Sequence, residues 1–138
     1  PDYVKLQGTF RAMNEEYRSI SHEKIREICQ NVANEMGGSC EVDIKIGYPF
    51  LKNDEKLTSA CFKNAQTFLS SNEVIEISKR MTAEDFAYYT HHVPACFYRL
   101  GVGFAGQEDR LLHNAYFDVD ENSLKLSVGM MAWLAVNA

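Results

Sequence analysis

Residues 25–46 read IREICQNVANEMGGSCEVDIKI. In the first half of this stretch, apolar residues recur at spacings of three and four, which places them on one face of a helix. The members of that face are Ile25, Ile28, Cys29, Val32, Ala33 and Met36. In the second half, residues 40–46 alternate between apolar and charged, which is typical of a strand with one buried face. The Gly37-Gly38 pair between the two patterns indicates where the helix ends.

The residues before this stretch predict another strand. Residues 3–13 alternate between apolar and polar side chains. Asn14 follows them and can accept a hydrogen bond from the first turn of a helix, where Glu15 and Glu16 favour the positive end of the helix dipole. Residues 3–47 are therefore expected to form a strand–helix–strand unit that is covered on one face.

A break at Gly47-Tyr48-Pro49 is the candidate domain junction. After it, Asn53 or Asp54 is expected to start a helix, and Thr82 to cap a short one that ends before Pro94. The apolar run 95–102 suits a strand buried on both faces, and a polar loop follows over 103–110. A last helix is expected to start at Asp120 or Asn122, with a core face of Leu124, Val128, Met131, Ala132 and Ala135. Alternating helices and strands predict an α/β fold.

The composition excludes several classes of protein. The chain has 138 residues and a net charge of -5, which argues against a surface for nucleic acid or anionic lipid. No apolar run approaches the roughly 20 residues of a membrane-spanning helix. The four cysteines form no CxxC pair, which favours free thiols and a reducing cytoplasm.

Two features indicate that the chain continues on its N-terminal side. It begins with Pro1 rather than Met. In its second half, only two or three strands are evident, and isolated pairs of strands are marginally stable in water. We therefore expect neighbouring strands in a segment that precedes Pro1.

Three positions carry residue types that can take part in binding or catalysis, and each also has a structural explanation. His113 follows the loop after the apolar run 95–102, where α/β proteins place their sites, and a neutral imidazole there can bind zinc. A structural or solvated histidine is the alternative. Glu84 and Asp85 can act as paired carboxylates, or simply stabilise the start of a helix. Arg11 can grip a carboxylate through two hydrogen bonds, or form an ion pair.

Four segments, in order, carry a resemblance. They are Gly8-Thr9-Phe10-Arg11, Gly47-Tyr48-Pro49 with Asn53-Asp54, Met81-Thr82-Ala83-Glu84-Asp85-Phe86, and Leu112-His113-Asn114 with Phe117-Asp118. Together they resemble the amidohydrolase branch of the zinc aminoacylase/carboxypeptidase-G peptidase family, which includes hippurate hydrolases and N-acyl-amino-acid deacylases. The third and fourth segments are the specific ones.

The resemblance implies an architecture. Residues 1–48 would be the second half of a lid domain that makes a homodimer, and residues 49–138 would be the C-terminal part of a mixed-sheet catalytic domain. A complete site of this family holds two divalent metals, here expected to be zinc, with Mn, Co or Ni as alternatives.

The resemblance also implies roles for individual residues. His113 corresponds to the family's last metal ligand, and Arg11 to a lid arginine that holds the carboxylate of the substrate. Met81, Thr82, Ala83 and Glu84 correspond to a turn that lines the substrate pocket. Thr82-Ala83 departs from the glycine or serine usual there, which puts a backbone contact to substrate in doubt. The general base and the other ligands have no counterpart here, so no catalytic residue is expected within the chain.

The sequence thus predicts the C-terminal part of a cytoplasmic, metal-dependent amidohydrolase that cleaves N-acyl amino acids or short peptides, and that is inactive as this chain alone. Two other readings compete with it. One is a non-catalytic α/β module for dimerisation or interaction. The other is a regulatory protein that has lost its metals. A His113 that is buried against apolar side chains or paired to a nearby carboxylate would favour the interaction module, and one that points into an open cleft that has lost one wall would favour the enzyme.

Overall fold

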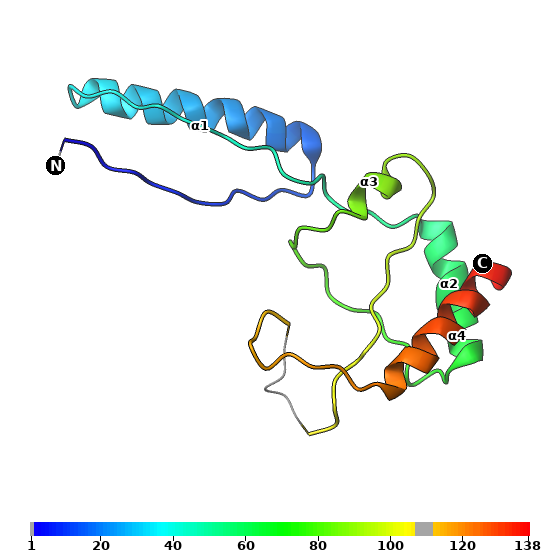
Figure 1. Cartoon of the computed structure of the whole chain (residues 1–138). Coiled ribbons are helices and arrows are strands. Elements are labelled where there is room, and N and C mark those ends of the chain that lie inside the picture. The colour runs from blue at the N-terminus through cyan, green and yellow to red at the C-terminus, as the bar shows by residue number, and fades with distance from the viewer. Residues whose placement is uncertain (1, 107–111) are drawn as a thin grey trace. The chain divides into compact units, whose positions relative to one another are not determined.

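The computed structural model describes residues 2–106 and 112–138, and it divides the chain into two compact units. The first unit comprises residues 1–52 and 78–92, and the second comprises residues 53–77 and 93–138. Helices α1 and α3 belong to the first unit, and α2 and α4 to the second (Figure 1). The loop expected over 103–110 lies partly outside the described residues.

Helix α1 spans Glu15–Glu35 and begins and ends as its sequence predicts. The Asn14 side chain accepts a hydrogen bond from the Tyr17 N–H at 2.7 Å, which satisfies one of the amides that a helix start leaves unpaired. At the other end, Gly37 adopts a φ of 76°, and the Gly38 N–H bonds the Ala33 carbonyl at 2.9 Å. Glycine reaches this left-handed conformation without the steric cost that a side chain would bring.

Helix α3, Ala87–Thr90, is shorter than predicted, and Thr82 does not cap it. No side chain caps the helix, which follows a turn in which the Ala87 N–H bonds the Glu84 carbonyl at 3.2 Å. The chain over residues 78–84 is irregular. The capping pattern predicted a helix turn too early, because Thr and Asp can serve turns as well as caps.

In the second unit, α2 (Glu55–Phe68) packs against α4 (Asn122–Asn137). Asp54 caps α2 by accepting from the Leu57 N–H at 2.8 Å. Asp120 accepts from the Asn122 N–H at 2.9 Å at the start of α4. The indole N–H of Trp133 donates to the Asn64 carbonyl at 2.9 Å, which ties the two helices together.

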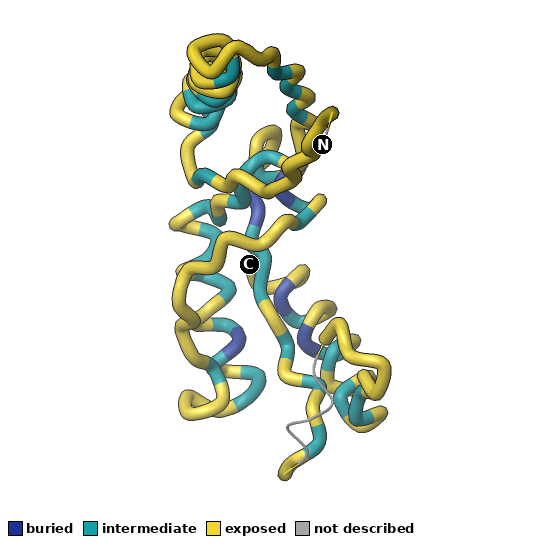
Figure 2. The backbone as a smooth tube through the Cα atoms, turned by 90° about the vertical axis from the view of Figure 1, so that its left-hand side faces the viewer, coloured by how far each residue is buried: buried dark blue, intermediate teal, exposed yellow. Residues whose placement is uncertain are grey.

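The core between α2 and α4 is small. Its buried residues are Ala65, Met130 and Leu134, with Cys61, Phe68, Leu69, Val74, Tyr98 and Trp133 packed against them. In Figure 2, buried positions form only a few short segments of the chain. At Gly129, an added Cβ would lie 3.1 Å from the Phe68 ring, so the glycine permits the close approach of α4 to α2.

The predicted core face of α4 is wrong. Leu124, Val128 and Met131 are mostly exposed, and the helix instead buries Met130 and Leu134. Apolar residues occur all round the C-terminal half of this helix, so their periodicity does not select one face. The contact with α2 selects it.

The predicted α/β fold, with its strand–helix–strand unit and mixed sheet, is also wrong for the described residues. They contain helices, turns and extended backbone, but no strand (Figure 1). A strand exists only where its backbone is hydrogen-bonded to a neighbouring strand. Residues 3–10 and 41–46 carry the alternation of a strand, yet no described backbone hydrogen bond pairs them, and most of their side chains are exposed. Alternation of apolar and polar residues indicates which face a strand would bury. It does not show that a neighbouring strand is present to pair with it.

The apolar run 95–102 is held by hydrogen bonds to residues 53 and 54 rather than by a neighbouring strand. The Asn53 side chain donates to the Phe97 carbonyl at 2.9 Å and accepts from the Phe97 N–H at 2.8 Å. One amide side chain thus satisfies both backbone groups of Phe97, as a neighbouring strand would. The Asp54 N–H also bonds the Ala95 carbonyl at 2.9 Å.

Replacing Asn53 by alanine is expected to lower the free energy of unfolding by about 1–3 kcal/mol, because it removes two hydrogen bonds that are each worth about 0.5–1.5 kcal/mol. Chemical denaturation followed by circular dichroism measures this loss. The exposed Asn72 provides a control, since its replacement by alanine should change stability by less than about 0.5 kcal/mol. Equal losses for the two variants would contradict this role of Asn53.

Candidate functional site

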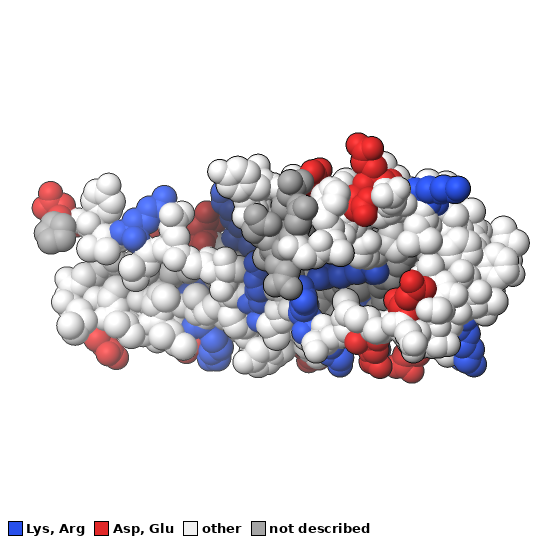
Figure 3. Space-filling model, turned by 90° about the horizontal axis from the view of Figure 1, so that it is seen from below, with Lys and Arg blue, Asp and Glu red and all other residues white. Residues whose placement is uncertain are grey.

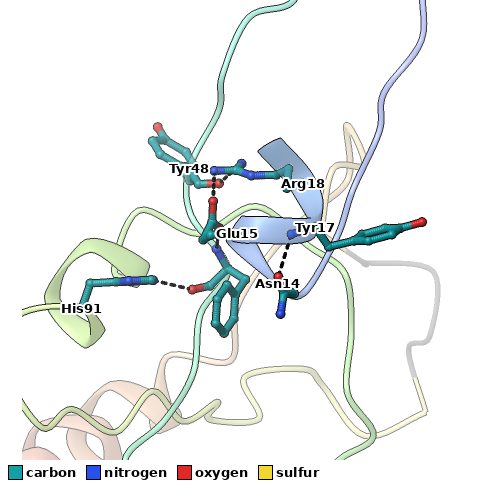
Figure 4. Close-up of polar contacts among 7 residues, drawn as sticks. Asn14, Glu15, Tyr17, Arg18, Tyr48 and His91 are labelled. Carbon is teal, nitrogen blue, oxygen red and sulfur yellow. Dashed lines mark hydrogen bonds and ion pairs between the residues drawn. The ribbon is translucent and has the colours of Figure 1, made fainter. Parts of the chain in front are cut away.

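The junction at Tyr48-Pro49-Phe50 is bound to the start of α1 (Figure 4). Glu15 accepts from the Phe50 N–H at 2.9 Å and forms an ion pair with Arg18. Arg18 in turn donates to the Tyr48 carbonyl at 2.9 Å. Glu15 is half-buried, and its two carboxylate oxygens bind different partners, Arg18 and the Phe50 N–H. The first turn of α1 therefore holds the backbone of the junction in place.

Helix α3 is anchored to the same junction. The His91 Nε2 lies 3.0 Å from the Phe50 carbonyl, which requires a proton on that nitrogen. The rings of Phe50 and His91 are 5.5 Å apart, and those of Tyr48 and Tyr88 are 5.9 Å apart, both edge-to-face. The predicted pocket turn, residues 81–84, lies directly before this anchored helix.

The pocket turn itself is open. Met81, Thr82 and Ala83 are exposed, and Glu84 is half-buried. A carboxylate oxygen of Glu84 accepts from the Phe86 N–H at 3.3 Å. This contact directs the Glu84 carboxylate to the turn that precedes α3, whereas the three preceding side chains are exposed.

Arg11 is exposed on the extended segment that leads into α1. Its neighbour Phe10 packs against α1, with ring centroids 6.5 Å from Tyr17 and 6.2 Å from His22. Phe10 therefore anchors the backbone that carries Arg11. Among the described hydrogen bonds and ion pairs, none joins Arg11 to residues 81–84, although both belong to the first unit.

His113 lies in the second unit, and its backbone is unusual. Its φ is 65°, and among the described residues no other residue except glycine has a positive φ. This conformation is uncommon for a residue with a side chain, although histidine adopts it more readily than most. The turn is stabilised by Asn114, whose carbonyl accepts from the Phe117 N–H at 3.0 Å and whose side chain accepts from the Tyr116 N–H at 2.9 Å. The imidazole of His113 is exposed.

The described residues do not build a complete metal site. In residues 2–106 and 112–138, no three side chains of His, Cys, Asp or Glu gather closely enough to hold an ion. His113 can offer one ligand, and zinc in proteins takes three or four. The described part of the chain therefore does not fit a metal by itself, and no reaction step can be assigned to a metal held by these residues alone.

Acidic and basic side chains are interspersed among uncharged ones on the face drawn in Figure 3. Of the helices in the described part of the chain, none has the length and apolar character needed to cross a bilayer.

No sequence motif indicates one pair of cysteines in the second unit. Cys61 on α2 and Cys96 in the 95–102 run are far apart in the chain, yet Cys96 adds to burial in raising the pKa of Cys61. Their spacing matches no motif, so only the packing of the second unit reveals the pair.

Comparisons with known proteins agree on one family. The sequence pattern of Peptidase family M20/M25/M40 matches residues 5–137. A probable hydrolase of Synechocystis sp. is 30% identical over 97% of this chain and 35% of its own length. An N-acetyldiaminopimelate deacetylase of Pediococcus pentosaceus is 28% identical over 92% of the chain and 32% of its own length. Thermostable carboxypeptidase 2 of Saccharolobus solfataricus is 30% identical over 99% of the chain and 34% of its own length.

These relatives are all hydrolases by name, and the chain spans about a third of their length. No solved structure is significantly similar to the chain.

Proposed function

The chain belongs to Peptidase family M20/M25/M40, and from that premise we propose that it is the C-terminal portion of a metal-dependent amidohydrolase. The complete protein would cleave the amide bond of N-acyl amino acids or short peptides. Relatives named as a deacetylase and a carboxypeptidase support this substrate class, because both names describe cleavage of an amide bond.

The observation that carries the proposal within this chain is the state of His113. An exposed imidazole on a strained backbone is a functional candidate, because strain of this kind persists where the surrounding structure maintains it. An enclosed ring would have favoured the interaction module instead. In our proposal, His113 supplies one ligand, and the remaining ligands and the general base belong to other parts of the complete protein.

Divalent metals, proposed to be two zinc ions, would polarise the scissile carbonyl and acidify water. The chain's own residues would bind and orient the substrate. Arg11 would hold the substrate carboxylate by two parallel hydrogen bonds. Met81, Thr82 and Ala83 would line the pocket, and Glu84 would shape the turn through its bond to the Phe86 N–H.

We also propose that residues 1–48 belong to a lid domain that pairs with a second copy, and residues 49–138 to the catalytic domain. The apolar residues of α1 support a pairing role, since Ile28 and Val32 are more than half exposed. The four free cysteines support a cytoplasmic location, where thiols stay reduced.

The test is an assay of the complete gene product that contains this chain. We expect hydrolysis of N-acetyl and N-benzoyl amino acids, loss of activity with a chelator, and recovery when Zn, Mn, Co or Ni is added. The chain alone, assayed in parallel, should be inactive. Failure of the complete protein to cleave any of these substrates with every metal would overturn the proposal.

Replacing Arg11 by alanine in the complete protein is expected to raise KM about 10–100-fold with little change in kcat, because a charge-assisted hydrogen-bonded contact to the substrate carboxylate is worth about 1.5–3 kcal/mol. Steady-state kinetics measure the split between KM and kcat. For substrates whose carboxylate is blocked as an amide, Arg11→Ala should leave KM unchanged. As a control, Arg26→Ala should have the KM and kcat of the unmodified protein. A loss of equal size with the blocked substrates would refute the carboxylate contact.

A further inference from the structure

Two separate side chains bind the backbone of Phe50 in the junction (Figure 4). The Phe50 N–H donates to a carboxylate oxygen of Glu15 at 2.9 Å, and the Phe50 carbonyl lies 3.0 Å from Nε2 of His91. Glu15 comes from the start of α1, and His91 directly follows α3. One residue of the junction therefore connects the start of α1 with the end of α3, and all of these residues belong to the first unit.

The segment that carries Arg11 is fixed to the first turn of α1. Asn14 ends this segment, and its side chain accepts from the Tyr17 N–H at 2.7 Å. The Asn14 carbonyl accepts from the Arg18 N–H at 2.9 Å. Because Glu15 directly follows Asn14, the contact between Glu15 and the junction also fixes the position at which the Arg11 segment joins the helix.

The pocket turn, residues 81–84, is fixed to the same junction through α3. The Ala87 N–H bonds the Glu84 carbonyl at 3.2 Å, so the turn continues directly into the helix. Ala87 is completely buried, which limits how far this part of the helix can shift. At the other end of α3, His91 bonds Phe50 and its ring packs edge-to-face on the Phe50 ring at 5.5 Å. The junction thus holds α3, and α3 holds the pocket turn.

Glu15 is the side chain in this arrangement with the strongest contacts. It forms an ion pair with Arg18, and the two side chains are only 35% and 14% exposed. Arg18 also donates to the Tyr48 carbonyl at 2.9 Å, so both members of the pair bind the backbone of the junction. Hydrogen bonds to charged groups are stronger than those between neutral groups. Stabilising the helix dipole does not require these contacts, because the exposed Glu16 in the same turn also provides a negative charge.

We propose that Glu15 is a positioning residue that fixes the spacing between Arg11 and the pocket turn through Phe50 and His91. The inference rests on the proposed function, in which Arg11 binds the substrate carboxylate and the pocket turn lines the rest of the site. Without the Glu15 carboxylate, the Phe50 N–H loses its acceptor, and the Arg11 segment and the turn are no longer held to one point. A substrate that contacts both then binds with Arg11 displaced. A substrate without a carboxylate does not use Arg11 and is unaffected.

The kinetic test compares Glu15→Ala with Glu16→Ala in the complete protein, because the two acids are neighbours in the first turn of α1. A misplacement of about 1 Å can cost up to about 100-fold, so we expect Glu15→Ala to raise KM for free N-acyl amino acids about 10-fold. KM for amide-blocked substrates should stay unchanged, and Glu16→Ala should behave as the unmodified protein. A partial loss of folded enzyme would instead lower kcat for both kinds of substrate and leave KM unchanged.

A double variant tests whether Glu15 acts through Arg11. Residues that act through one another show non-additive effects. Glu15→Ala combined with Arg11→Ala should therefore have the KM of Arg11→Ala alone. A KM for the double variant well above that of Arg11→Ala would overturn the positioning role.

Hydrogen exchange of the complete protein measures the connection without any substrate. We expect Glu15→Ala to speed amide exchange in residues 48–52 and also in residues 84–91, which Glu15 reaches only through the junction. Residues 55–68 of α2, in the second unit, should keep their protection. Glu16→Ala should change none of the three segments.

The outcomes separate this inference from the proposed function. An active protein in which Glu15→Ala and Glu16→Ala have equal KM values, or in which residues 84–91 exchange at an unchanged rate, would overturn the positioning role alone. A rise in KM of the same size for amide-blocked substrates would do the same. A complete, unmodified protein that cleaves none of the substrates would overturn the proposed function itself, and the positioning role with it.

Discussion

Replacing His113 by asparagine in the complete protein is expected to lower kcat/KM about 1,000-fold, which corresponds to about 4 kcal/mol of activation free energy. Mutation of residues that only orient a metal ligand already lowers metal affinity or activity about 10–100-fold, and loss of the ligand itself should lower it further. Asparagine is the sharper replacement, because it tolerates the positive φ of this position and so removes the imidazole without adding backbone strain. Bound metal should fall together with activity.

Two measurements separate this effect from a structural one. Elemental analysis gives the metal content per active site, and thermal melting shows whether the fold is retained. His92, which is exposed on the segment after α3, provides the matched control, and His92→Asn should keep full activity and metal. If His113→Asn retained both metal and activity, His113 would not be a ligand, and the main support for the enzyme within this chain would be lost.

Replacing Leu134 by alanine is expected to lower the free energy of unfolding of the second unit by about 2–5 kcal/mol. Leu134 is 6% exposed and is one of only a few buried side chains between α2 and α4. With so small a core, the cavity left by the missing atoms removes a large share of the packing that holds the two helices together. Urea denaturation followed by circular dichroism measures the loss.

Leu124 on the same helix is the matched control for this experiment. It is 56% exposed, so Leu124→Ala should change the free energy of unfolding by less than about 0.5 kcal/mol, although the chemical change is identical. The sequence pattern places Leu124 on the core face, whereas the structure places Leu134 there. Similar losses for the two variants would contradict the observed packing of α4.

Local signals in the sequence were sufficient for both ends of α1 and for the start of α2. Asn14 and Asp54 cap helices because a short polar side chain reaches the amides two or three residues on, and Gly37 ends α1 because glycine alone adopts its φ freely. These interactions join residues only a few positions apart, so the local sequence is enough to predict them. The motif that contains His113 was likewise readable, and it led to the correct family.

The sequence by itself therefore determined both ends of α1, the start of α2, the family and the residues to be tested. Only the tertiary structure decided which face of α4 is buried and that the alternating segments are unpaired in the described chain. Each of these depends on contacts between residues far apart in the chain. The periodicity of a sequence indicates that a residue prefers to be buried or paired. Which partner it meets depends on how distant parts of the chain pack together, and a local pattern does not contain that information.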